Sequence, residues 1–210
     1  MWMLEQLETH LLIGSTLVEG STLTEDEAAR VLAGKTVLGH PLREIRELYS
    51  YRASVAWLIE AVSRVPFVSV DLIVEFHTRL FSGTPARQGF KTHDNFTYRT
   101  DGTKHAYASP PQVPERMRAF LDAFNNNPSA RGAVPAAAAA LYYAFQDTHP
   151  FDDGNGRIGR VLVAYWAHWH HSLAFRFYAS DRLAHLAALE SANVGDFDLL
   201  REFFEMRMTP

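Results

Sequence analysis

One stretch between two apolar helical segments constrains this chain more than any other. It spans residues 149–160 and reads His-Pro-Phe-Asp-Asp-Gly-Asn-Gly-Arg-Ile-Gly-Arg. An Ala-rich run entered at Pro135 precedes it, and Pro150 should end that helix because proline disfavours helix at the residue before it. We therefore expect His149 at the end of the first helix. The apolar pattern that resumes at Ile158 predicts a second helix directly after the glycine turn.

The middle of this stretch has the composition of an anion site. Gly154, Asn155 and Gly156 allow backbone amides to converge at the start of the second helix, where the helix dipole adds partial positive charge. Arg157 and Arg160 are three residues apart and project from neighbouring positions of one helical turn. These residues predict a site for phosphate.

Asp153 and His149 add chemistry to the predicted anion site. A carboxylate beside bare phosphate is unfavourable, but Mg²⁺ takes carboxylate and phosphate oxygens together, so Asp153 indicates a metal ligand. His149 is the group in this stretch that can accept a proton near neutral pH. A base, a metal ligand, an anion nest and two guanidinium groups together indicate phosphoryl or nucleotidyl transfer to a hydroxyl.

Two plainer interpretations fit parts of the same stretch. Asp-Gly and Asn-Gly are ordinary turn signals that could simply reverse the chain between helices. A calcium loop is the other, but the EF-hand order of alternating acids, central glycine and closing glutamate is not met. Neither accounts for His149, Arg157 and Arg160 occurring with the turn.

The stretch resembles the signature of the Fic family, His-x-Phe-x-(Asp/Glu)-Gly-Asn-Gly-Arg-x-x-Arg, at every specified position. The resemblance implies an all-α Fic fold, a helical bundle around a helix-loop-helix motif with a small β-hairpin flap. It implies one domain over residues 1–210. It also implies a protein adenylyltransferase, which moves AMP from MgATP to a Ser, Thr or Tyr hydroxyl of a protein. Some Fic relatives transfer other phosphate-containing groups, and some remove AMP.

The resemblance also implies roles for individual residues of the motif. His149 would be the catalytic base, and Asp153 would hold Mg²⁺. Phe151 is interpreted as a core anchor that holds the loop. The residues implied to bind nucleotide are Gly154, Asn155, Gly156, Arg157 and Arg160.

The N-terminal segment matches a second Fic pattern. Ser15 to Gly20 reads Ser-Thr-Leu-Val-Glu-Gly, as in the Ser/Thr-x-x-x-Glu-Gly/Asn motif of the Fic inhibitory helix. Apolar residues at helical intervals from Leu4 to Val18 and the terminal glycine fit an ordinary packing helix as well. The resemblance implies an inhibitory helix over residues 1–20, whose Glu19 pairs with Arg160.

Residues 89–111 differ in character from the helical segments. Phe96-Thr97-Tyr98 and His105-Ala106-Tyr107 alternate apolar and polar side chains around Asp101-Gly102, which predicts a β-hairpin. It could be a surface hairpin without a functional role. The resemblance implies a flap whose edge holds an extended target segment by main-chain hydrogen bonds.

Apolar periodicity predicts the remaining helices. They span residues 24–34, residues from 41 through 58, residues 69–81 and residues 113–124. The inward residues predicted for the longest of these are Leu42, Ile45, Leu48, Tyr49, Trp57 and Leu58. His77 is assigned a core or surface role. Residues 192–196 interrupt two later helical stretches; Asn193 could merely cap a helix, and the resemblance implies that it contacts adenine.

Composition excludes several classes of protein. With 210 residues and 47% hydrophobic side chains, the chain is large enough for one domain with a real core. The net charge of −4 and the lack of a basic block argue against nucleic acid and anionic membranes as partners. The chain contains no cysteine, which is compatible with a reducing cytosol, and the N-terminus does not resemble a signal peptide. We therefore expect a soluble, cytoplasmic protein.

Several functional alternatives remain open at the level of sequence. One is a Fic enzyme that removes AMP, with Glu19 orienting water; another transfers a different phosphate-containing group. A third is a nucleotide-sensing module without turnover, against which the complete set of His149, Asp153 and Arg160 argues. The expected partners are a target protein presenting a hydroxyl along the flap, the chain itself through self-modification, and a second copy in a homodimer.

Overall fold

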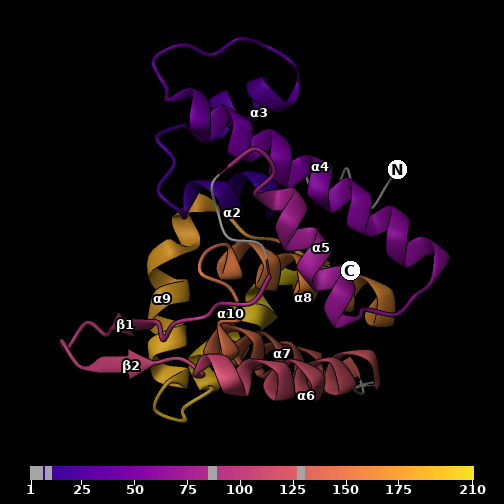
Figure 1. The fold of residues 1–210 in the computed structure, drawn as a ribbon, viewed down its shortest axis with the longest axis vertical. Helices are drawn as coiled ribbons and strands as arrows, with labels where there is room; N and C mark the ends of the chain where they lie inside the picture. The colour runs from indigo at the N-terminus through magenta and orange to yellow at the C-terminus, as the bar shows by residue number, and fades with distance from the viewer. Residues whose placement is uncertain (1–6, 8–10, 85–88, 127–130) are drawn as a thin grey trace.

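The fold is almost entirely helical, as Figure 1 shows. The computed structural model describes residues 7, 11–84, 89–126 and 131–210. The α-helices are α2 (Ile13–Leu17), α3 (Glu25–Leu32), α4 (Leu42–Arg64), α5 (Val70–Leu80), α6 (Val113–Asn126), α7 (Val134–Thr148), α8 (Asn155–His171), α9 (Arg182–Ala192) and α10 (Asp198–Arg207). The predicted all-α class is confirmed.

Two small antiparallel hairpins accompany the helices. The strands β1 (Phe96–Tyr98) and β2 (Lys104–Ala106) pair with Thr97 opposite His105, which confirms the predicted hairpin. The strands β3 (Ala174–Phe175) and β4 (Met208–Thr209) form a second pair that the sequence did not predict. This pair joins the end of the chain to the segment that follows α8.

Helix α8 forms the centre of the core. Every residue from Arg157 to Ala167 is buried, because α2, α5 and α7 pack around this helix. A helix that is covered on all sides needs apolar side chains all round, which the Ile-Val-Leu-Ala-rich sequence of α8 supplies. Arg157 and Arg160, near the start of α8, are therefore buried charges that require polar partners. None of the helices in the described ranges combines the length and apolar character needed to cross a membrane.

The ends of the first helices follow the predicted capping signals. Thr24 and Glu27 exchange side-chain and backbone hydrogen bonds in a capping box at the start of α3. Gly20 and Gly34 follow α2 and α3 with φ of +97° and +75°, which glycine adopts without strain. Leu4, where the first predicted helix begins, lies outside the described residues.

Two of the residues predicted to face inward on α4 do not. Leu42 is 63% exposed and Tyr49 is 40% exposed, whereas Leu48 and Leu58 are buried. The first turns of α4 extend past the main core and pack on a smaller apolar cluster with residues of α2 and α3. The Tyr49 hydroxyl instead donates to the carbonyl of Val31, 2.6 Å away. Helical periodicity gave the apolar face of α4 but not how far the core extends along it.

Because α7 packs closely against α8, substitution of Gly159 should have a large effect on stability. A Cβ at Gly159 would lie 2.3 Å from Nε2 of Gln146 and 3.1 Å from the ring of Phe145. Gly159→Ala should lower the free energy of unfolding by about 1–3 kcal/mol, since overpacking forces these side chains to move. Thermal unfolding followed by circular dichroism measures this as a midpoint several degrees below that of wild type.

The matched control is Gly132→Ala. Nothing lies within 4 Å of a Cβ at Gly132, and its φ is not in the left-handed region. This variant should unfold close to the wild-type midpoint. Equal midpoints for Gly159→Ala and wild type would contradict the packing described for α7 and α8.

Candidate active site

His149 terminates α7 with φ of 45° and ψ of 60°, so the chain turns sharply into the loop that precedes α8. Pro150 follows and cannot continue the helix, as predicted. Nδ1 of His149 lies 3.3 Å from the carbonyl oxygen of Gln146. A proton on Nδ1 satisfies that carbonyl and leaves the lone pair on Nε2. The imidazole also stacks on Tyr107, with ring centroids 3.9 Å apart.

The charge state of His149 suits a proton acceptor. Burial lowers its pKa to about 4, because the imidazolium form would lose its hydration. The hydrogen bond to Gln146 raises the pKa and the ammonium of Lys91 lowers it, but burial is the largest effect. The ring is therefore neutral near pH 7 and can accept a proton at Nε2.

The turn into α8, residues 154–156, is where the sequence predicts an anion nest, and the name nest is kept for it. Gly154 has φ of 83°, and a Cβ there would lie 2.7 Å from the ring of Phe81, so only glycine fits. The first amides of α8 have no partner within the helix. The Asn155 side chain is occupied within the loop by both backbone groups of Phe151, at 3.0 and 2.8 Å. Asn155 would therefore reach a phosphate through its backbone amide.

The loop between the helices is anchored by aromatic packing. Phe151 is fully buried and stacks on the imidazole of His77, with centroids 4.0 Å apart and planes 7° from parallel. Burial lowers the pKa of His77 to about 4, so this ring is neutral near pH 7. His77 is a core residue, as predicted, and Phe151 holds the loop against it.

Asp153 projects its carboxylate at the rim of the nest. Its side chain is 65% exposed, and Oδ1 accepts a hydrogen bond of 2.6 Å from the amide of Gly154. Arg157 Nη2 lies 3.5 Å from the same oxygen. No group of three His, Cys, Asp or Glu side chains able to hold a metal occurs in the described part of the chain. A single carboxylate beside a phosphate nest nevertheless fits Mg²⁺, which commonly takes one or two carboxylates, with water and substrate phosphates completing its shell.

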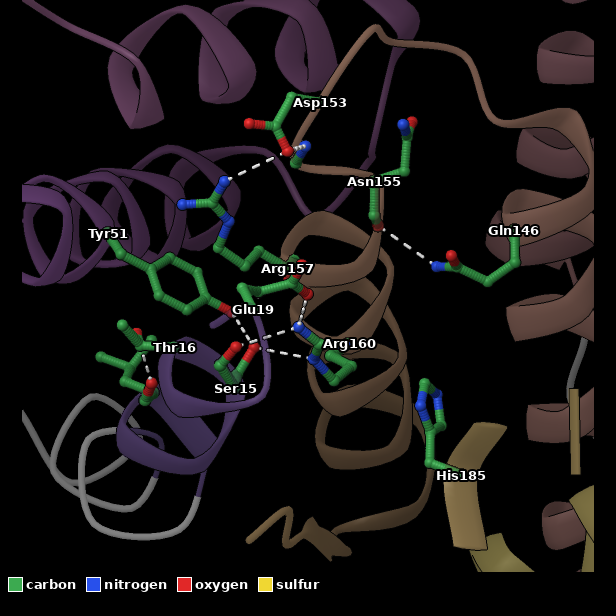
Figure 2. A network of polar contacts seen from close by, with 12 residues as sticks. Ser15, Thr16, Glu19, Tyr51, Gln146, Asp153, Asn155, Arg157, Arg160 and His185 are labelled. Atoms are coloured by element: carbon green, nitrogen blue, oxygen red, sulfur yellow. Dashed lines mark hydrogen bonds and ion pairs between the residues drawn. The ribbon is translucent and has the colours of Figure 1, made fainter. Parts of the chain in front are cut away.

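Arg160 is held by the N-terminal helix, as Figure 2 shows. Its Nη2 donates to Oε1 of Glu19 at 2.5 Å and to the carbonyl oxygen of Ser15 at 3.1 Å. Its Nε donates to the hydroxyl of Ser15 at 2.7 Å, and that hydroxyl lies 3.1 Å from the hydroxyl of Tyr51. Arg160 is only 2% exposed, so these contacts satisfy a buried charge.

Glu19 also lies against the anion nest. A Cβ on Gly156 would be 2.7 Å from Oε1 of Glu19, so the carboxylate occupies the space above that glycine. Burial acts to raise the pKa of Glu19, but the charge of Arg160 and its hydrogen bond outweigh it, and the pKa is lowered. Glu19 therefore remains ionised near neutral pH, and its negative charge adjoins the glycine turn in which the anion site was predicted.

A cavity of about 360 Å³ lies beside this loop, between the flap, α7 and α9. Asn193, at the end of α9, is one of its lining residues, together with Tyr107 of the flap. The amide of Asn193 also completes α9 by bonding to the carbonyl of Leu189 at 2.9 Å. Asn193 thus ends α9 and lines the cavity, and its expected contact with adenine stays a prediction.

This arrangement of loop, helix and flap has close parallels. Residues 67–167 match the sequence model of the Fic/DOC family. They form a Fic/DOC family domain. Among solved structures, a Fic-domain signalling protein of Bacteroides thetaiotaomicron has a TM-score of 0.84 at 22% identity, over 97% of this chain and 83% of that one. Caenorhabditis elegans Fic-1, residues 134–508, has a TM-score of 0.77 at 21% identity, over 98% of this chain and 61% of that one.

Curated relatives of the Fic domain include named transferases. Protein adenylyltransferase fic-1 of Caenorhabditis briggsae is 26% identical over 182 residues, which are 85% of this chain and 35% of that protein. A probable protein adenylyltransferase of Aquifex aeolicus is 27% identical over 139 residues, 66% of this chain and 39% of that protein. The chain thus spans between a third and two fifths of the length of these relatives.

The structure brings the expected residues of the N-terminal helix and of the motif together around the turn into α8, whereas Asn193 lies at the end of α9 and lines the cavity. Three further residues had no sequence signal strong enough to single them out. Tyr51 donates to the carbonyl of Arg157 at 3.0 Å and supports Ser15. Tyr107 stacks on the base, although it was expected only as part of the flap.

Glu44 is the third of these residues and fixes the segment that follows Glu19. This buried carboxylate accepts hydrogen bonds from the amide and hydroxyl of Thr22, at 2.7 and 2.9 Å, and from the hydroxyl of Ser21 at 3.0 Å. A glutamate in the first turn of a predicted helix is common, so only the folded chain reveals its partners.

Proposed function

We propose that this Fic domain is a protein adenylyltransferase that moves AMP from MgATP to a Ser, Thr or Tyr hydroxyl. The observation that carries the proposal is a neutral imidazole at the edge of an anion nest. His149 at the end of α7, the glycine turn at residues 154–156 and two buried guanidinium groups at the start of α8 lie within twelve consecutive residues. The curated relatives, which are named protein adenylyltransferases, support the same activity.

The chain's own residues account for the transfer step. Nε2 of His149 takes the proton from the target hydroxyl, and the oxygen forms a bond to the α-phosphorus of ATP. The bond from that phosphorus to the bridging oxygen breaks, and pyrophosphate leaves. The nest amides and Arg157 hold phosphate oxygens while negative charge shifts to the leaving group. Mg²⁺, when Asp153 holds it, offsets phosphate charge.

The cavity supplies a place for the nucleoside. Its volume of about 360 Å³ is within the range of small-molecule sites, and its wall includes Tyr107, which stacks on His149. The Asn193 side chain offers both a donor and an acceptor, which suits the edge of adenine. The flap that forms one wall also has a free strand edge, which suits an extended segment of a target protein or of the chain itself.

We also propose that residues 1–20 regulate a core formed by residues 21–210. Glu19 pairs with Arg160 and lies above Gly156, where the terminal phosphates of a productive ATP would go. A carboxylate there repels the polyphosphate, and a paired Arg160 is not free to hold it. ATP then binds in an unproductive pose.

The reverse reaction is a second candidate, for one reason. The Glu19 side chain remains 35% exposed, so its carboxylate could orient a water towards AMP on a modified target. If wild type releases AMP from a modified target and Glu19→Gly does not, Glu19 serves AMP removal as well as the inhibition of AMP transfer.

Labelled ATP tests which group is transferred. In parallel incubations, label on the α-phosphate should appear on protein, and label on the γ-phosphate should not, since attack occurs at the α-phosphorus. Intact-protein mass should increase by one AMP for each site. The Glu19→Gly variant is the enzyme to use, because Glu19 inhibits AMP transfer in wild type. Transfer of γ label alone would replace this proposal with a kinase.

A further inference from the structure

The tip of the flap is fastened to the end of α9. The amide of Thr100 donates to Oε1 of Glu190 at 2.8 Å, and its hydroxyl donates to Oε2 at 2.6 Å. One position earlier, Nη2 of Arg99 donates to the carbonyl oxygen of Asn193 at 3.1 Å. Both oxygens of the Glu190 carboxylate are therefore used to hold the hairpin turn. Figure 1 shows the hairpin β1–β2 reaching across α9.

The base of the flap is held by different contacts. Nε2 of His105 lies 3.1 Å from Oδ1 of Asp147 in α7, and Arg116 from α6 donates to the other oxygen of Asp147 at 2.6 Å. Tyr107 stacks on His149. The hairpin thus spans the cavity between α7 and α9, attached at both ends.

The residues that make the contacts at the flap tip also line the cavity. Arg99, Thr100, Glu190 and Asn193 all line the cavity. The strands of the flap are three residues long, and a short isolated hairpin is marginally stable in water. Without its fastening to α9, this wall of the cavity would be open for part of the time.

We propose that Glu190 is a positioning residue that keeps the nucleoside cavity formed by holding the flap tip on α9. This inference rests on the proposed function, because it takes the cavity to be the nucleoside site. Glu190 acts through Thr100 and the flap, not on the reacting atoms. It lies on a different helix from the signature motif, 30 residues beyond Arg160, so the motif does not point to it.

The test measures the affinity of the full chain for MgADP by titration calorimetry. ADP lacks the γ-phosphate, so the Glu19 carboxylate should interfere less with the binding of ADP than with that of ATP. Glu190→Ala should raise the Kd for MgADP about tenfold, since it removes two hydrogen bonds to a charged group. Amide hydrogen exchange over residues 96–106 should become faster in the same variant. Its thermal midpoint should change little, because the Thr100–Glu190 contact is at the surface.

A matched pair at Thr100 isolates the contact from other effects of removing Glu190. Thr100→Ser keeps the hydroxyl and should bind MgADP as wild type does. Thr100→Val has nearly the same shape, loses one of the two bonds, and should bind more weakly. In the Glu19→Gly background, Glu190→Ala should raise the KM for ATP with little change in kcat for self-modification.

Two results would overturn the inference, and they differ in what else they affect. A Kd for Glu190→Ala equal to or below that of wild type, with unchanged hydrogen exchange, removes the role of Glu190 and leaves the adenylyltransferase proposal intact. If wild type and Glu19→Gly bind neither ADP nor ATP, the nucleoside cavity and the proposed function fail together.

Discussion

Glu19→Gly should raise the rate of AMP transfer by about tenfold to a thousandfold. The substitution removes the carboxylate that pairs with Arg160 at 2.5 Å and lies above Gly156. Losing one partner of a partly buried pair changes energies by a few kcal/mol, and each roughly 1.4 kcal/mol in a barrier is about tenfold in rate. The measurement is incorporation of α-labelled ATP into the protein itself and into lysate proteins.

Two variants make this prediction specific to the pair. Glu19→Gln keeps the side-chain shape and adds no backbone freedom, so it should also be faster than wild type. Arg160→Ala should be inactive even in the Glu19→Gly background, because the phosphate clamp itself is gone. If Glu19→Gly is folded, binds MgATP, and modifies neither itself nor any lysate protein faster than wild type, Glu19 is a structural residue.

His149→Ala should lower transfer in the Glu19→Gly background by about 10²- to 10⁴-fold, the range that a general base contributes. The nest, the arginines and Asp153 are untouched, so nucleotide binding should remain measurable. The same α-labelled assay gives the rate, and calorimetric titration with MgADP gives the binding. Full activity in His149→Ala would exclude it as the base.

The backbone at His149 calls for a second variant. Its φ of 45° is a conformation that alanine adopts at a cost and asparagine tolerates well. His149→Asn should therefore match wild type in thermal stability and still lose transfer as His149→Ala does, which separates loss of the base from strain in the loop.

The pH profile gives an independent readout of the base. The pKa of His149 is lowered to about 4, so the imidazole is neutral, and competent, at all pH values above that. In the Glu19→Gly enzyme, transfer should not fall through the range around 6.5 where an ordinary histidine titrates. It should fall as the pH approaches 4. A loss of activity centred near 6.5 would mean that the ring is more hydrated than this geometry indicates.

The helix ends and the glycine turn of residues 149–160 were readable from sequence because they are local. Pro150 stops α7 at His149, glycine is required at position 154 beside Phe81, and α8 begins at once. A turn between two helices leaves few ways to arrange twelve consecutive residues. The capping box at Thr24 and the hairpin at Asp101-Gly102 are local for the same reason.

Contacts between distant segments were not readable in this way. Glu19 was expected opposite Arg160 only because a second motif resembled a known one. The partners Tyr107 for His149, Glu44 for Thr22, and Glu190 for Thr100 had no sequence signal at all. Leu42 and Tyr49 were misplaced because periodicity identifies a face but not where its covering ends.

The sequence by itself therefore determined the helical class, the helix ends at Pro150 and the glycines, and which polar side chains lie close together in residues 149–160. The tertiary structure decided which side chains meet that turn and which cavity opens beside it. The physical reason is that backbone dihedral preferences and turn chemistry act over a few residues. The position of Glu19 against α8, or of the flap tip against α9, depends on how the whole core packs.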